Sequence, residues 1–130
     1  MSVKVIRLAI LFGLTAIILG AFGAHALKAV LSEQQLISFE TGVRYQVYQA
    51  LFLLFVGSTN LLSDKAKKIS TIFITIGVLF FSFSIYLLAT QGLFGINFKF
   101  LGPITPVGGL LIMIGWAYTA IKVGKQKNNN

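Results

Sequence analysis

The sequence predicts an all-α protein, a four-helix transmembrane bundle, and two observations carry this prediction. The first is composition: 56% of the 130 residues are hydrophobic, only 11% are charged, and the mean hydropathy is +0.86, well above the level of a soluble domain. The second is that apolar residues gather in four runs of about 20 residues, the length that an α-helix needs to cross the hydrocarbon core. Because four such spans use most of the chain, we expect a single integral membrane domain, residues 1–130.

Each run is expected to be a helix. Backbone amides cannot stay unpaired in lipid, and no run alternates polar and apolar residues as a barrel strand does. The basic start and the small residues Ala24 and Ala26 also resemble a signal peptide, but further spans follow, so we expect an uncleaved first helix. The expected spans are about residues 8–27, 43–62, 69–90 and 104–123.

The connection between the first two spans predicts a short helix of its own. Ser32 and Gln35 have the spacing of a capping box, and the apolar Leu36 and Phe39 follow it. We therefore expect a short amphipathic helix lying along the membrane surface. The sequence leaves open whether Gly42 separates this helix from the second span or the two are continuous.

Basic residues predict the orientation of the bundle. By the positive-inside rule, the side with more lysine and arginine faces the cytoplasm, which places both termini there. We also expect the tail after Lys125 to be disordered. The count is eight on one side (Lys4, Arg7, Lys65, Lys67, Lys68, Lys122, Lys125 and Lys127) against three on the other (Lys28, Arg44 and Lys99).

Charge and composition also restrict the partners. The formal net charge of +8 lies beside the spans, so the expected partners are anionic lipid head groups on the cytoplasmic side, and nucleic acid is not expected. With no cysteine there is no disulfide framework and no thiolate site, and a single histidine does not make a metal site. We expect no cofactor and no metal.

Small residues recur along the first and fourth spans with the spacing of helix-packing stripes. In lipid, helices associate through close van der Waals contact, which small side chains allow. We expect these stripes to pack inside the bundle, although a homo-oligomer seam or a surface for a larger membrane complex remains an alternative. The residues are Ala9, Gly13, Ala16, Gly20 and Gly23 in the first span, and Gly108 and Gly115 in the fourth.

Polar residues are expected to gather at one depth near the outer ends of the spans. Two interpretations remain: an interfacial anchor in which Glu40 pairs with Arg44 at i, i+4, or an outward pocket for a lipid head group, a quinone-like molecule or a small anion. Neither needs a catalytic residue. The candidates are His25, Glu40, Arg44, Tyr45, Tyr48, Gln49, Tyr86 and Thr105.

Several segments resemble a known family, the domain of unknown function 423 family, also called the transmembrane protein 256 family. The resemblance covers nearly the whole chain. The sequence departs from the family pattern at two positions: a histidine often stands at the position of Gln49, and a glycine often stands at the position of Phe83. It implies a multi-pass inner-membrane protein without an established activity. The segments are LGAFGAH at 19–25, TGVRYQ at 41–46, FSFSIY at 81–86, and ITPVGG at 104–109 with Gly115-Trp116.

Three hypotheses for function follow. The first is a non-enzymatic protein associated with lipid or with a larger complex. The alternative is a small, oligomeric transporter or channel with an outward-facing polar pocket. An intramembrane enzyme using His25 with Glu40 or Arg44 comes third, because neither a nucleophile nor an ordered catalytic geometry is visible.

Overall fold

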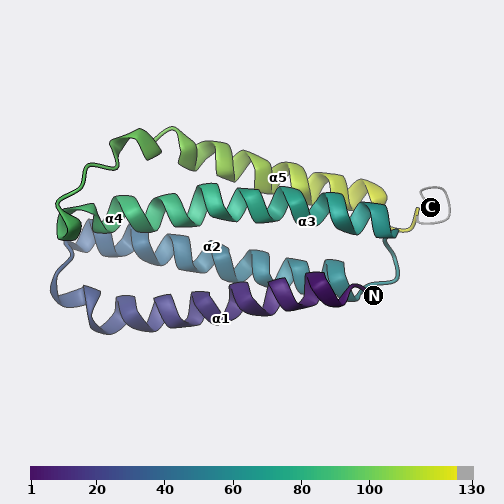
Figure 1. Cartoon of the computed structure of the whole chain (residues 1–130), viewed down its shortest axis with the longest axis horizontal. Coiled ribbons are helices and arrows are strands. Elements are labelled where there is room, and N and C mark those ends of the chain that lie inside the picture. The colour runs from purple at the N-terminus through teal and green to yellow at the C-terminus, as the bar shows by residue number, and fades with distance from the viewer. Residues whose placement is uncertain (126–130) are drawn as a thin grey trace.

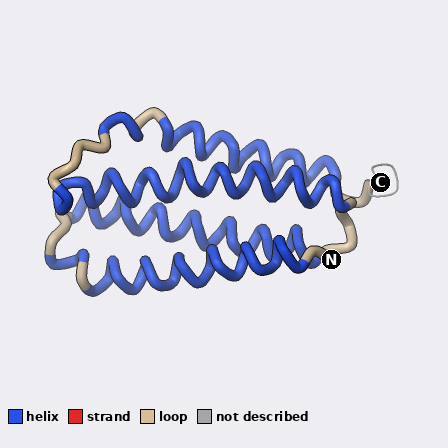
Figure 2. Tube along the Cα trace, viewed as in Figure 1, coloured by secondary structure: helices blue, strands red, loops and turns tan. Residues whose placement is uncertain are grey.

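The computed structural model describes residues 1–125, and they form a bundle of long antiparallel helices (Figures 1 and 2). The all-α architecture is therefore confirmed. Lys127 and the tail of residues 126–130 lie outside the described residues. The elements are α1 (Val3–His25), η1 (Leu27–Ala29), α2 (Glu33–Ser58), α3 (Asp64–Val78), η2 (Leu79–Phe83), α4 (Ser84–Phe94), η3 (Lys99–Leu101) and α5 (Ile104–Lys122).

Helix α2 absorbs the short helix expected before the second span. Its capping box is present, because Ser32 accepts from the Gln35 amide and the Gln35 side chain accepts from the Ser32 amide. From there α2 continues without a break to Ser58, so the separate surface helix is not a distinct element. Gly42 does not interrupt α2. The space beside that glycine is filled by Tyr86, whose Cε1 would lie 2.7 Å from an added Cβ.

Helices α3 and α4 follow one path, joined by the π-helical turn η2. Helix α5 approaches this turn so closely that a Cβ on Gly108 would overlap the backbone nitrogen of Phe81. On the same seam, a Cβ on Gly77 would lie 2.7 Å from Ile112, and one on Gly115 would lie 2.8 Å from Ile74. Only glycine allows the two backbones to come this near.

The other seam joins α1 to α2. Ala9 and Ala16 are buried there, and the Cβ positions of Gly13, Gly20 and Gly23 face Ala50, Val43 and Phe39, respectively. The small residues of α1 thus lie against α2, and those of α5 lie against α3 and η2. A larger apolar core joins α1, α2, α3 and α5.

Three helical stretches are long and apolar enough to cross a membrane: 3–29, 64–94 and 99–122. Helix α2 is as long as these, but Arg44, Gln46 and Gln49 lower its apolar character. Both glutamines are buried within the bundle. These two glutamines therefore serve contacts inside the protein, whereas Arg44 is exposed.

Both ends of the described chain are hydrogen-bonded to the segment that contains the end of α2 and the α2–α3 connection. The Ser2 amide donates to the carbonyl of Gly57 at 2.7 Å, and the Gly124 amide donates to that of Leu61 at 2.8 Å. Figure 1 shows this end of the bundle at the right. Helix α2 ends at Ser58, earlier than the expected boundary at 62, because residues 59–63 turn the chain toward α3. Ser63 is the N-cap of α3.

Candidate functional site

The polar residues expected to form one outer cluster divide into groups. His25, Glu40 and Arg44 are exposed, and within residues 1–125 no hydrogen bond or ion pair joins them to the other candidates or to one another. The Glu40–Arg44 pair expected from the spacing is therefore not formed, although α2 is continuous between them. Both side chains are exposed on the surface of the bundle.

A buried hydrogen-bond network centres on Gln46, which is 0% exposed. Its amide nitrogen donates to the Phe12 carbonyl at 2.8 Å and to the Thr15 hydroxyl at 2.7 Å, both on α1. Its amide oxygen accepts from the Tyr86 hydroxyl on α4 at 2.6 Å. A single side chain thus links α1, α2 and α4, with both donors and one acceptor position used.

Sequence analysis identified Tyr86 but missed Gln46 as its partner. The signal was present, because Gly42, Gln46 and Gln49 follow one another in steps of four and three and so share a helix face. That face is the buried one. Ser82 belongs to the same region, since its hydroxyl donates to the Gly42 carbonyl at 2.8 Å.

Gln49 lies one turn further along α2, in a different environment. It is 3% exposed, and its amide oxygen accepts from the indole nitrogen of Trp116 on α5 at 2.8 Å. The Trp116 ring stacks on Phe52, with centroids 4.0 Å apart and an interplanar angle of 18°. Within the described residues, the Gln49 amide nitrogen donates no hydrogen bond.

Gln49 and Trp116 line a lateral groove between α2, η2 and α5 with a volume of about 570 Å³. We call it the aromatic groove. Tyr45 packs edge-on against both Tyr48 and Phe81, which gives one wall an aromatic surface. The aromatic groove is lined by Tyr45, Tyr48, Gln49, Phe81, Gly109, Ile112, Met113 and Trp116.

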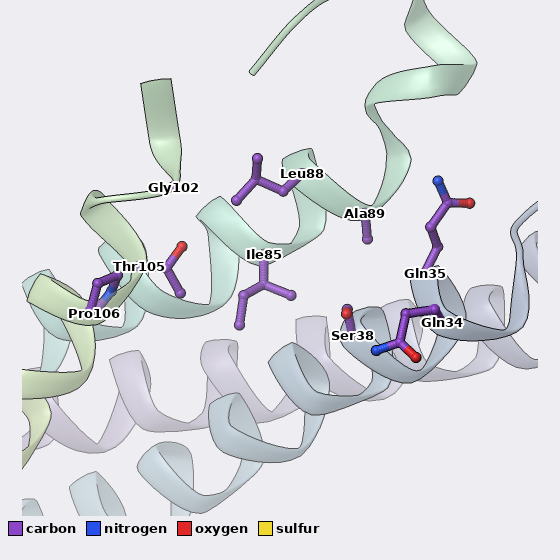
Figure 3. A pocket seen from close by; sticks show the side chains of 9 residues that line it. All are labelled: Gln34, Gln35, Ser38, Ile85, Leu88, Ala89, Gly102, Thr105 and Pro106. Carbon is purple, nitrogen blue, oxygen red and sulfur yellow. The ribbon is translucent and has the colours of Figure 1, made fainter. Parts of the chain in front are cut away.

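A second cavity opens at the end of the bundle away from the termini. We call it the outer cleft; its volume is about 440 Å³, and Figure 3 shows it between the start of α2, the side of α4 and the start of α5. Thr105 stands at its α5 side and is hydrogen-bonded to Ser84 at 2.6 Å. Gln34 and Ser38 come from the α2 side, opposite Thr105.

The structure therefore places the other five candidates in three locations. Tyr45, Tyr48 and Gln49 share the aromatic groove, Thr105 lines the outer cleft, and Tyr86 lies in the Gln46 network. Within the described residues, no group of three or more histidine, cysteine, aspartate or glutamate side chains could hold a metal ion.

Comparison with known proteins places the chain in a family. The model of the family described as "Protein of unknown function (DUF423)" matches residues 19–109, which include Gln46, Gln49 and Tyr86. The chain belongs to the DUF423 family. The resemblance inferred from the sequence segments is thereby confirmed.

Relatives of this DUF423 protein are named as membrane proteins in several bacteria. A UPF0382 membrane protein of Haemophilus influenzae is 35% identical over 128 residues, 98% of this chain and 99% of that protein. One of Staphylococcus haemolyticus is 37% identical, covering 82% of this chain and 83% of its own. The UPF0382 inner membrane protein YgdD of Escherichia coli is 32% identical, covering 81% and 77%. No solved structure matches the chain.

Both the family and its curated relatives carry descriptions without an assigned activity. This DUF423 protein is thus a multi-pass membrane protein of a family without an assigned function, as the sequence analysis expected.

Proposed function

We propose that this protein is a non-enzymatic membrane component that binds an apolar, carbonyl-bearing lipid of the quinone class in the aromatic groove. The observation that carries the proposal is the Gln49 side chain. It is almost fully buried at the groove, and Trp116 holds its amide oxygen, while its amide nitrogen has no acceptor within residues 1–125. An oxygen of a ligand in the groove would accept a hydrogen bond from this unused donor.

The walls of the aromatic groove favour a flat ring with an apolar tail. Aromatic side chains pair through offset or edge-on contacts, and Tyr45, Phe81 and Trp116 offer both ring faces and ring edges. Gly109 and Met113 extend the apolar surface along α5. A small anion, one of the ligands considered from the sequence, would find no cationic side chain among the lining residues.

Depth along α2 argues for a ring carbonyl over a phospholipid ester. Gln49 lies about 24 Å from the start of α2 and about 14 Å from its end at the helical rise per residue. If α2 crosses a hydrocarbon core of about 30 Å, this places Gln49 well inside it. Phospholipid esters stay near the core boundary, whereas the ring of an apolar quinone can reach this depth.

The topology proposed with this function is a fourth crossing by α2, with both termini in the cytoplasm. Helix α2 packs along α1, and its buried glutamines are paired inside the bundle, so they need not face lipid. The eight-to-three distribution of basic residues supports the orientation. Anionic head groups on the cytoplasmic side, and a homo-oligomer or larger membrane complex, complete the proposed partners.

Tryptophan fluorescence tests the proposal directly, because Trp116 is the single tryptophan of the chain. Purified protein in detergent is titrated with a short-chain ubiquinone, which quenches indole fluorescence on contact. We expect saturable quenching, and Gln49→Leu should weaken binding roughly tenfold through loss of the donor. Met113→Phe, which narrows the groove, should weaken it as well.

The matched control is Ile121→Phe, an exposed position on the same helix outside the groove. It should bind as the wild type does. Quenching that rises linearly without saturation, equally in all four proteins, would show only partition of quinone into the micelle and would refute the proposal.

The outer cleft favours one second candidate, a small transporter or channel with an outward-facing pocket. Its wall carries Gln34, Gln35, Ser38 and Thr105, which can exchange hydrogen bonds with a polar solute. The test is flux into proteoliposomes. Uptake of an ion or solute above protein-free vesicles, reduced by Thr105→Val, would favour transport over simple lipid binding.

A further inference from the structure

A separate cavity of about 560 Å³ lies between the first turns of α1 and α3, at the end of the bundle that holds the α2–α3 connection. We call it the basic cavity. Lys4, Lys67 and Lys68 line it together with one acidic residue, Asp64. Three ammonium groups and one carboxylate give these four side chains a formal charge of +2, and the α-ammonium of Met1, which also lines the cavity and interacts with Lys67, adds a further positive charge. It shares no lining residue with the aromatic groove or the outer cleft.

Lys67 is the unusual member of this group, because only 3% of it is exposed. Its ammonium donates to the Gly57 carbonyl at 3.2 Å, and this is the one acceptor it has within residues 1–125. An ammonium has three N–H donors. Asp64 does not pair with it. Burying a charge with so few partners is costly, and an anion in the cavity would offset that cost.

Thr71 gives a second, independent indication. It lies one turn beyond Lys67 on α3 and lines the same cavity, and its hydroxyl oxygen is buried without a hydrogen-bond partner. Buried hydroxyls in proteins are nearly always paired. A ligand with several acceptor oxygens would satisfy both the Lys67 ammonium and the Thr71 hydroxyl.

The position of the basic cavity indicates where such a ligand comes from. The continuous stretch 64–94 has 31 residues, or about 46 Å at the helical rise, against a hydrocarbon core of about 30 Å. About 8 Å at each end therefore extends into the head-group region, which includes residues 64–68. Ile72, which is exposed, continues the cavity wall toward the hydrocarbon.

We propose that the basic cavity binds the phosphate group of an anionic phospholipid, with Lys67, Lys68 and Thr71 as hydrogen-bond donors and the acyl chains running past Ile72. This site would hold an individual lipid by its head group, beyond the general attraction of surface lysines to an anionic leaflet. It stands independently of ligand binding in the aromatic groove, because the two cavities share no residue.

Native mass spectrometry of the full chain in a mild detergent tests the proposal. The protein is mixed with phosphatidylglycerol, and separately with phosphatidylcholine of the same acyl chains. We expect one phosphatidylglycerol to be retained in preference to phosphatidylcholine. Lys67→Gln should weaken retention about tenfold, since a charge-assisted hydrogen bond is lost. Because Lys67 is buried, Lys68→Gln and Thr71→Val provide milder variants, each expected to weaken retention severalfold.

Lys65→Gln is the matched control. It removes the same charge from the same turn of α3, but Lys65 is exposed and does not line the cavity. Retention in this variant should stay within twofold of the wild type. An equal loss in Lys65→Gln and Lys68→Gln, or equal retention of the two lipids, would overturn the proposal, since either result reduces the effect to surface charge or acyl-chain binding.

Soluble phosphate separates the two possible sources of the anion. Inorganic phosphate or glycerol phosphate at moderate concentration should not displace the retained phosphatidylglycerol, because neither has acyl chains to hold it beside Ile72. Displacement of the lipid by either anion would assign the basic cavity to a free phosphate compound and would overturn the lipid assignment.

Discussion

Gln46 and Gln49 stand three residues apart on the buried face of α2, and nearly identical exposure conceals different environments. Gln46 makes three hydrogen bonds, to Phe12, Thr15 and Tyr86, and leaves no donor unused. Gln49 makes one, to Trp116, and it lines the aromatic groove. The difference teaches that burial alone does not distinguish a structural polar residue from a ligand-binding one here. What distinguishes them is unused hydrogen-bonding capacity beside a cavity.

The largest effect on stability is expected from Gln46→Leu. The change leaves the buried Tyr86 hydroxyl without its acceptor and removes two bonds to α1, so the free energy of unfolding should fall by about 2 to 3 kcal/mol. Helical circular dichroism during SDS titration of the detergent-solubilised protein measures this loss. Quinone quenching of Trp116 in the folded fraction should be unchanged; a variant of wild-type stability would contradict the structural role given to Gln46.

Tyr86→Phe should have the next largest effect, about 1 kcal/mol, because it removes one donor to Gln46 and leaves the packing of the ring intact. Combined with Gln46→Leu it completes a double-mutant cycle. We expect a coupling of about 0.6 to 1.7 kcal/mol between the two side chains, the range for hydrogen bonds between membrane helices. Strictly additive effects would mean that the hydrogen bond does not contribute to stability.

Gln49→Leu should change stability less, by about 0.6 kcal/mol, since a single hydrogen bond to Trp116 is lost. Its larger effect should be on quinone quenching, the reverse of the result for Gln46→Leu. Gln49→His can retain a hydrogen-bond donor and should bind within about threefold of wild type. If Gln49→Leu lowers stability as much as Gln46→Leu does, the contrast between the two glutamines fails.

The smallest effects are expected from His25→Ala and Arg44→Gln. Both side chains are exposed and make no contact with the Gln46 network or the aromatic groove, so stability should stay within about 0.5 kcal/mol of wild type. Quinone quenching should also match the wild type. If Arg44→Gln alone lost quinone binding, Arg44 would be part of the ligand site, contrary to its exposed position outside the aromatic groove.

The expected outer cluster shows where sequence reasoning reached its limit. Depth along each helix could be read from position in the span, and Tyr45, Tyr48 and Gln49, which are neighbours on α2, line one groove. Rotation about the helix axis could not be read in the same way. That rotation turns Gln46 into the bundle and Arg44 out of it, although they are two residues apart.

Buried polar pairs in the half of the bundle nearer the termini were missed for the same reason. Ser70 on α3 and Thr119 on α5 share a buried hydrogen bond of 2.7 Å across 49 residues of sequence. Lys67 was counted as one of several surface cations, yet it is buried, and its ammonium donates to the Gly57 carbonyl near the end of α2. No local pattern distinguishes it from Lys65 or Lys68, because its burial depends on segments far away in the chain.

The sequence alone determined the class of the protein. Apolar composition, the length of the apolar runs and the need to pair backbone amides in lipid are local properties, and together they require helices in a membrane. Glycine spacing similarly marked faces suited to close packing. The tertiary structure decided which polar groups meet, because that depends on how each helix is rotated against its neighbours. The Gln46 network, the aromatic groove and the basic cavity are all built between helices distant in sequence, where only the packed bundle brings their side chains together.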